Sequence, residues 1–283
     1  MLFILSIVTM QILRIGIVSN VGSIALFTPI IVTLAMTLHL NPVSFSMGVH
    51  VVALMCCGTY VQGDEWEPRD DAVEVEYQLL GNQGWEYIEI FNGVTRLLER
   101  DLHHELGLSS KRIRIRWGGA RIFDRYRWAT WRGTIDIKRG HVERYAPWGL
   151  DHPAKIVASE GPRRMRFDTD TFGDADGIEF WVNDVKRMDF AIHVEIPNFN
   201  GGTTIDWHVN GEMLETHKGS VSFEVGGIGL KLVVEQLTEQ ELPRDIRGHL
   251  QVALHPGLNG IYLRARQQDD HRVFTSPLFI TRQ

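Results

Sequence analysis

Strict alternation of apolar and charged side chains between residues 112 and 117 is the feature that most constrains this chain. Three apolar residues alternate with three arginines: Ile113, Ile115 and Trp117 against Arg112, Arg114 and Arg116. Successive side chains of a β-strand point to opposite faces of the sheet. The pattern therefore predicts a strand with one buried face and one solvated face.

The same period-two pattern recurs from Trp131 to Lys138, with apolar Trp131, Ile135 and Ile137 on one face. A slip of one residue would turn the tryptophans outward and bury the arginines. We therefore expect Trp117 and Trp131 in the core and Arg114 at the surface. In an alternative interpretation, the two tryptophans are exposed and form a ligand platform for a sugar or a phosphate. Its basic residues would be Arg121, Arg125 and Arg127.

Further strands are predicted along the chain, separated by turn sequences and by almost no helix. The clearest candidates are Val73–Leu79, Trp85–Phe91, Phe190–Ile196 and Ile205–Val209. Asn210-Gly211 is a typical two-residue hairpin signal, and Ser276-Pro277 should interrupt the last strand. A single short helix is expected from the spacing of Leu98, Leu102 and Leu106. This spacing of strands is typical of antiparallel sheets packed as a β-sandwich.

Charge is distributed very unevenly along the 283 residues. Arg14 is the only charged residue before Asp64, and the chain is densely charged afterwards. Two uncharged runs, Ile15–Leu40 and Val43–Gln62, each reach the roughly 20 residues that a membrane-spanning helix needs. The expected fold class is therefore mainly β, an antiparallel β-sandwich region preceded by a short α-helical transmembrane segment. A buried helical hairpin is the alternative for the two runs.

The predicted domain organisation follows from this break in charge. Residues 1–63 would form hydrophobic transmembrane helices, 64–109 a linker with the first strands, and 110–283 the β-sandwich region. Whether that region divides into two subdomains near residues 183–188 is left open. The net charge of −6 gives no reason to expect a polyanion as a partner, so no nucleic acid is predicted.

Several polar clusters are candidate sites. His103-His104 lies in the predicted helix and is expected at the surface. Because neighbouring helix positions point in different directions, a metal site there would need other ligands, and the sequence shows none. Asp151-His152 is expected to form a turn. Four aspartates between Phe167 and Gly177 favour a charged hairpin loop, with calcium binding as the alternative: Asp168, Asp170, Asp174 and Asp176. The sequence assigns no catalytic, cofactor-binding or metal-binding residue.

Two segments of the apolar part resemble the large membrane subunit of TRAP-type transporters. They are Ala25–Ile30, which contains Thr-Pro-Ile, and Asn41–Phe45. The resemblance covers about fifty residues and implies a permease fragment in a bacterial-type inner membrane. The lipid bilayer and a separate transporter subunit would be its partners. Small and polar residues near Pro29 would form a broken helix of the kind that lines transport sites: Ser19, Asn20, Gly22, Ser23, Thr28 and Pro29.

The region from Trp85 to the C-terminus resembles the β-rich part of PHP-type (polymerase and histidinol phosphatase) phosphoesterase-like proteins. The motifs that carry the likeness are Arg116–Arg121, Trp131–Ile135, Leu230–Glu235 and Arg272–Ile280. The His-x-His motif of that family's catalytic domain does not occur in the sequence. The resemblance therefore implies a non-catalytic accessory or binding module, tethered to the membrane. The alternatives are a transporter component and a hydrolase subunit that needs a separate catalytic chain.

Overall fold

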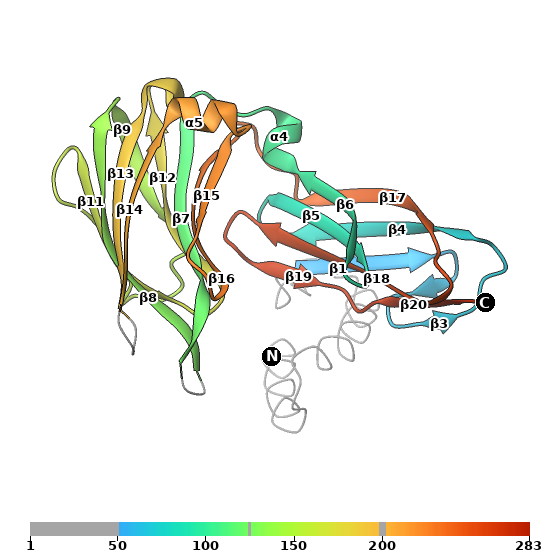
Figure 1. Ribbon diagram of the computed structural model, residues 1–283. Coiled ribbons are helices and arrows are strands. Elements are labelled where there is room, and N and C mark those ends of the chain that lie inside the picture. The colour runs from blue at the N-terminus through green and yellow to red at the C-terminus, as the bar shows by residue number, and fades with distance from the viewer. Residues whose placement is uncertain (1–50, 124–125, 198–201) are drawn as a thin grey trace, which may run out of the picture.

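The computed structural model describes residues 51–123, 126–197 and 202–283, and these residues form two β-sandwiches (Figure 1). The predicted class, mainly β with antiparallel sheets, is confirmed. The first sandwich uses strands from both ends of the described chain, so we call it the flanking sandwich. The second, the inserted sandwich, is built from the residues between them.

The flanking sandwich has two sheets. One contains, in spatial order, β17 (Asp245–Ala253), β4 (Ala72–Gly81), β1 (Val51–Cys57) and β2 (Tyr60–Val61). The other contains β3 (Glu65–Trp66), β20 (Leu278–Arg282), β18 (Gly257–Gln267), β5 (Trp85–Asn92) and β6 (Thr95–Asp101), with β19 (Arg272–Phe274) beside β18. Apolar side chains from both sheets, including Val75, Ile88 and Leu263, form one core.

The inserted sandwich is organised around two long strands, β7 (Arg112–Phe123) and β8 (Tyr126–Arg139). In one layer β7 lies between β12 (Ala175–Val182) and β16 (Ile228–Gln236), with β9 (Val142–Trp148) and β15 (Ser220–Glu224) outside them. In the other layer β8 lies between β11 (Arg164–Thr171) and β13 (Asp189–Ile196), with β10 (Ile156–Ser159) and β14 (Thr203–Asn210) outside them. The two strands pair only near their shared hairpin, which joins the layers.

Three short helices occur in the described residues. Helix α4 (Leu102–Leu106) follows β6 and leads into β7. A 3₁₀ helix (Val185–Arg187) and helix α5 (Gly211–Thr216) close one end of the inserted sandwich. The expected helix near Leu98 is therefore shorter than predicted, because Leu98 lies on β6 and pairs with Ile90.

The phase predicted for the two central strands is confirmed. Trp117 and Trp131 are 1% and 0% exposed, and the Trp117 ring stacks on Phe167 with ring centroids 3.9 Å apart. Each indole Nε1–H donates a hydrogen bond of 2.8 Å to a threonine hydroxyl, Thr169 for Trp117 and Thr171 for Trp131. These bonds satisfy the only polar group that each indole buries.

The prediction of a helix over Val43–Gln62 is wrong for residues 51–62, the part of this run that the structure describes. Residues 51–57 form β1, and residues 51–56 of this strand pair with residues 76–81 of β4. Ala53 and Met55 are buried, whereas Leu54 between them is exposed, so the run has the period of a strand. An uncharged apolar run is compatible with a buried strand as well as with a helix, and hydropathy alone does not distinguish the two. Among the described residues no helix has the length and apolar character to span a bilayer.

The observed division of the chain also differs from the expected one. Strand β1 precedes Gly63 yet shares a sheet with β4, and the C-terminal strands β17 to β20 belong with β1 to β6 rather than with β7. Residues 183–188 lie inside the inserted sandwich, around the 3₁₀ helix. The run Ile15–Leu40 lies outside the described residues.

Asn210-Gly211 does not form a hairpin turn. The Asn210 side chain instead accepts a hydrogen bond of 2.9 Å from the backbone N–H of Met213 and caps helix α5. Asparagine satisfies a helix N-terminus as readily as it fits a tight turn, which explains the wrong prediction. The interruption expected at Ser276-Pro277 is confirmed, since these residues separate β19 from β20.

Replacing Trp117 tests the core assignment. Trp117→Ala should lower the free energy of unfolding by about 3–5 kcal/mol, because it removes a buried ring and leaves a cavity. Arg132→Ala is a suitable control on β8: its side chain is 57% exposed and, among the residues that the structure describes, forms an ion pair only with Asp168, so its loss should stay below about 1 kcal/mol. Urea denaturation of the two variants measures both values, and equal losses would contradict the assignment.

Candidate functional site

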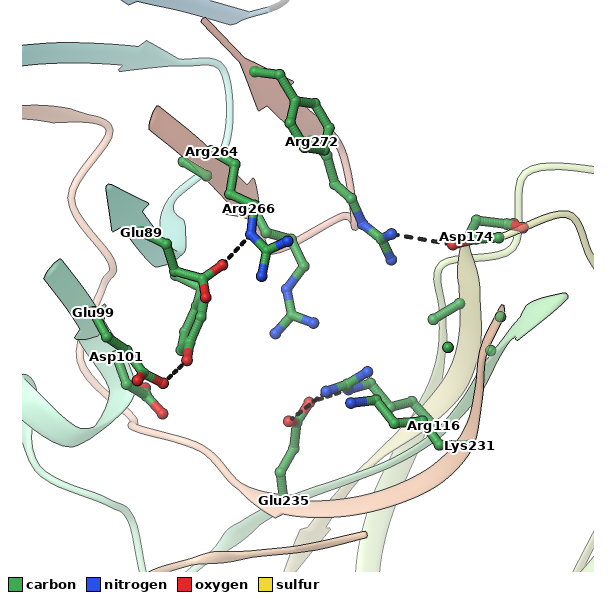
Figure 2. Close-up of a pocket in the computed structure, with 18 of the residues that line it drawn as sticks. Glu89, Glu99, Asp101, Arg116, Asp174, Lys231, Glu235, Arg264, Arg266 and Arg272 are labelled. Atoms are coloured by element: carbon green, nitrogen blue, oxygen red, sulfur yellow. Dashed lines mark hydrogen bonds and ion pairs between the residues drawn. The ribbon is translucent and has the colours of Figure 1, made fainter. Parts of the chain in front are cut away.

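A cleft of about 710 Å³ lies between the two sandwiches and is lined mainly by charged side chains (Figure 2). Strands β5, β6, β18 and β19 form one wall, and β7, β16 and the turn before β12 form the other. Its basic residues are Arg96, Arg116, Lys231, Arg264, Arg266 and Arg272, and its acidic residues are Glu89, Glu99, Asp101, Asp174 and Glu235.

A buried ion network lies behind this cleft and joins the two sandwiches. Arg114 on β7 makes a two-bond contact with Glu86 on β5, with Nη2–Oε1 and Nη1–Oε2 distances of 2.6 and 3.0 Å. Its Nη2 also donates to Glu179 Oε1 at 2.7 Å, and its Nη1 donates to Glu235 Oε1 at 3.3 Å. The side chains of Arg114 and Glu86 are each 1% exposed. The surface position expected for Arg114 is therefore wrong.

Arg114 is buried because the flanking sandwich covers the face of β7 on which it lies. Strand phase places Arg114 on the face of β7 opposite Trp117, as predicted, but the flanking sandwich covers that face and supplies Glu86. The Arg114 guanidinium also lies over the Trp148 ring, 4.2 Å from its centroid. Trp148 in turn donates its Nε1–H to the backbone carbonyl of Gln268 in the flanking sandwich. Period-two alternation alone does not distinguish a solvated face from one that another domain covers.

His103 is buried at the same junction, although a surface position was expected. Its Nδ1 accepts a hydrogen bond of 3.2 Å from the backbone N–H of Thr238, so the ring proton resides on Nε2. This Nε2–H points to Glu86 Oε1 at 3.2 Å. Histidine in this tautomer is neutral and supports the negative charge of Glu86. His104 is exposed, as predicted.

The buried carboxylates of the network remain ionised. Burial alone would raise the pKa of Glu86, but Arg114 and Arg266 hold this pKa well below its ordinary value. The same balance of burial against Arg116, Arg114 and Arg266 lowers the pKa of Glu235 to about 2. Both side chains therefore carry full negative charge at neutral pH.

Arg116 and Arg266 bring this network to the cleft surface. Arg116 donates from Nε and Nη2 to the two oxygens of Glu235, at 2.9 and 3.3 Å. Arg266 contacts Glu86 Oε2 through Nη2 at 3.1 Å, and its Nε is buried without a hydrogen-bond partner among the described residues. Burial, followed by the charges of Arg266 and Arg114, lowers the pKa of Arg116. Figure 2 shows the Arg266 guanidinium pointing into the middle of the cleft.

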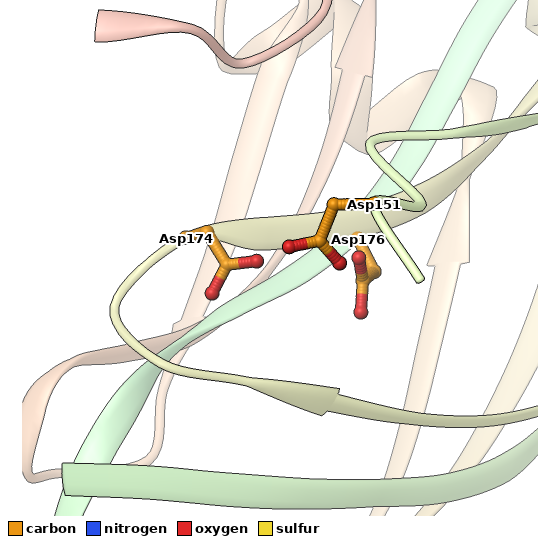
Figure 3. A group of neighbouring side chains, drawn as sticks. All are labelled: Asp151, Asp174 and Asp176. Carbon is orange, nitrogen blue, oxygen red and sulfur yellow. The ribbon is translucent and has the colours of Figure 1, made fainter. Parts of the chain in front are cut away.

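A second polar cluster lies at the turn between β11 and β12. The carboxylates of Asp151, Asp174 and Asp176 lie close enough together to hold a cation (Figure 3). The ammonium of Lys155 occupies this position, with Nζ 2.6 Å from Asp151, 2.9 Å from Asp176 and 3.5 Å from Asp174. Lys155 therefore serves as the internal cation of this cluster. Burial raises the pKa of the Asp176 carboxyl to about 6, although the Lys155 contact opposes this rise.

The other aspartates considered for calcium are not part of this cluster. Asp168 pairs with Arg132 at 3.3 Å, and Asp170 accepts a hydrogen bond of 2.5 Å from the Thr130 hydroxyl. The charged hairpin loop predicted for these aspartates is wrong: Asp168 and Asp170 lie on β11, and β11 and β12 belong to different layers and do not pair with each other. The third carboxylate beside Asp174 and Asp176 comes from Asp151, in the loop after β9. Asp151 forms an ion pair with Lys155 rather than with His152.

The proposed ligand platform is not assembled in the described residues. Trp117 and Trp131 are buried, Arg121 donates to the Thr203 hydroxyl at 2.9 Å, and Arg127 is exposed on β8. Arg121 lines a smaller hollow with Val225, Gly226, Gly227 and Ile228. Arg125 lies outside the described residues, as do the broken-helix positions Ser19, Asn20, Gly22, Ser23, Thr28 and Pro29.

Comparison with known proteins adds no identification. No protein-family model matches the chain, and neither the curated proteins nor the solved structures include a significant match. The fold and the cleft by themselves define a class: a β-protein of two sandwiches with a charged cleft at their junction.

The residues of the cleft and of the ion network cannot be recognised from the sequence. Glu86, of the ion network, and Glu89, of the cleft, lie on the predicted strand Trp85–Phe91, but nothing local distinguishes them, or Arg266, from the ordinary solvent-facing charges of a half-buried strand. They come together only because β5 pairs with β18 and the inserted sandwich packs against that sheet. The one available signal was their alternation with apolar neighbours, which also predicts an ordinary solvated face.

Arg114 should be indispensable for stability. Arg114→Ala leaves Glu86 buried without its main counter-charge, and removing one partner of a buried ion pair typically costs about 3–5 kcal/mol. The exposed control Arg132→Ala, already described, should lose less than about 1 kcal/mol. Urea denaturation at neutral pH checks this prediction, and a loss for Arg114→Ala no larger than for the control would show that the pair does not hold the sandwiches.

The depressed pKa values predict acid sensitivity. A carboxylate whose pKa is lower in the folded state than in the unfolded state stabilises the fold at high pH. For Glu235 this contribution should be lost as pH falls from its ordinary pKa of 4.5 to about 2. The Glu235→Gln variant should lose less stability than the wild type across this pH window, as measured by urea midpoints. An equal loss in both proteins would contradict the lowered pKa.

Proposed function

We propose that this chain is a ligand-binding module and that the inter-sandwich cleft is its binding site. The observation that carries the proposal is the cleft itself: about 710 Å³, open to solvent and lined by charged side chains from both sandwiches. This volume falls within the range of roughly 300–1,000 Å³ typical of small-molecule sites. The ligand class that fits is a small, polar molecule of about the size of a monosaccharide.

The chemistry of the walls supports a polar ligand with several hydroxyl groups. Glu99 and Asp101 face the cleft from β6, opposite Lys231 and Glu235 on β16 (Figure 2). A carboxylate offers about four acceptor positions, so Glu99, Asp101 and Glu235 can accept further hydrogen bonds from a ligand while keeping their present partners, and the Lys231 ammonium can donate. Phe274 also lines the cleft and is 63% exposed, which provides an apolar surface for the face of a sugar ring.

The rigidity of the site favours binding as the function. The cleft residues project mainly from paired strands, and the ion network behind them fixes the two walls relative to each other. A preformed site loses little conformational entropy when a ligand binds. The non-catalytic accessory role that the resemblance to PHP-type proteins implies, beside a separate catalytic chain, is compatible with such a module. The membrane tether and the transporter alternative both depend on residues 15–50, so they remain hypotheses.

Blocking the cleft tests this proposal. Ser220 on β15 lines the cleft and is exposed, so Ser220→Trp should fill the site. Because Ser220 lies directly opposite Glu235 in the β15–β16 pair, the melting temperature of the variant should be compared with that of the wild type to show that the ion network is intact. Ser222→Trp is the matched control, because Ser222 lies two residues along the same strand, is also exposed and does not line the cleft. Glucose, glucuronate and glucosamine are suitable probes, with saturation-transfer NMR on the full chain as the measurement.

We expect at least one of these sugars to bind the wild type in a saturable way. Binding should be lost in Ser220→Trp and kept in Ser222→Trp. If none of the three binds, or if Ser220→Trp binds as the wild type does, the cleft is not a site for this class of ligand.

A further inference from the structure

We propose that the cleft selects an anionic ligand, and that Arg266 and Arg116 hold its carboxylate or phosphate group. This inference rests on the proposed function and specifies the chemistry of the same site. It follows from three observations: the charge balance of the buried network, the unused donors of the two arginines, and their position at the cleft surface.

The buried network contains more positive than negative charge. Four arginines, Arg112, Arg114, Arg116 and Arg266, face three glutamates, Glu86, Glu179 and Glu235. Since His103 is neutral, four positive and three negative charges leave an excess of one positive charge. All seven side chains are at most 18% exposed, so water screens this excess poorly. An anion bound in the cleft would neutralise this excess positive charge.

The donors needed to bind that anion are present and unused. Arg266 donates no side-chain hydrogen bond among the described residues, and its one charged contact there is through Nη2 to Glu86. Its Nε also lacks a partner but is shielded from solvent, so a small shift of the side chain would be needed for this atom to reach a ligand. Arg116 uses Nε and Nη2 for Glu235, which leaves its Nη1 without a partner in the described chain. Guanidinium groups present their donors in a planar fork that matches the oxygens of a carboxylate or phosphate.

The remaining cations of the cleft have other partners. Arg264 pairs with Glu89, Arg272 with Asp270 at 3.0 Å, and Arg96 with Glu99 at 2.5 Å. Lys231 is the exception: its only charged contact in the described residues is with Glu224, at 3.9 Å. Because Lys231 lines the cleft with Arg116 and Arg266, it would add a third positive charge near the bound anion.

The test compares ligands that differ in charge. Glucuronate and inorganic phosphate should bind the full-length wild type, and glucose should bind more weakly than glucuronate. Arg266→Gln, which keeps much of the side-chain size but removes the charge, should weaken glucuronate binding by about 10- to 100-fold, the usual range for a lost hydrogen bond to a charged group. Isothermal titration calorimetry measures the affinities, and binding should weaken with added salt.

Two further variants separate binding from folding. Arg266→Lys keeps the positive charge beside Glu86 but loses the planar fork, so it should keep the melting temperature while binding glucuronate more weakly. Arg164→Gln is the matched control: Arg164 lies on β11, is half exposed and contacts Asp136 and Glu160 away from the cleft. It should bind as the wild type does.

The outcomes separate this inference from the proposed function. If glucose binds in the cleft as tightly as glucuronate, or if both Arg266 variants keep full affinity for glucuronate, the anion selectivity is overturned and the cleft remains a ligand site. If neither glucuronate nor phosphate binds while glucose does, the same conclusion holds. Loss of binding in the Ser220→Trp variant identifies the cleft in either case.

Discussion

The buried ion pair between Arg114 and Glu86 is the interaction on which the arrangement of the two sandwiches depends. Moving two charges out of water costs several kcal/mol for each ion. The pair is tolerated because the remaining hydrogen-bonding capacity is also used: His103 and Arg266 reach Glu86, while Glu179 and Glu235 reach Arg114. Sliding one sandwich over the other would leave these charges unpaired. The network therefore selects one orientation, which an apolar interface of similar size would specify less strictly.

This fixed orientation explains how the cleft arises. Strand β7 has one face in the core of its own sandwich and the other against the flanking sandwich, and Arg116 lies where that contact ends. The cleft is thus the edge of the interface, and its two walls come from strands that the ion network holds in place. Rigid strands position side chains more accurately than loops do. The same charges that join the sandwiches also determine which ligand charge the cleft would favour.

The chain connectivity is consistent with this arrangement. The inserted sandwich is joined to the flanking one by two segments: α4 with the loop that follows it, and residues 237–244. Both segments lie beside the ion network, because His103 is on α4 and its Nδ1 accepts from Thr238. The Asp101 side chain caps α4 by accepting from the backbone N–H groups of His103 and His104. A local capping interaction therefore helps to place a residue of the long-range network.

The sequence by itself determined the mainly β class, most strands, and the burial of Trp117 and Trp131, because strand phase is a local property of the pleated backbone. It did not determine what covers the opposite face. Arg114 is buried only because Glu86, on a strand of the other sandwich, meets it there. Residues 51–57 form a strand rather than a helix because β4 offers a pairing edge, and Asn210 caps a helix because α5 follows it. The cleft joins charges from strands far apart in the chain, so only the tertiary structure could bring its residues together.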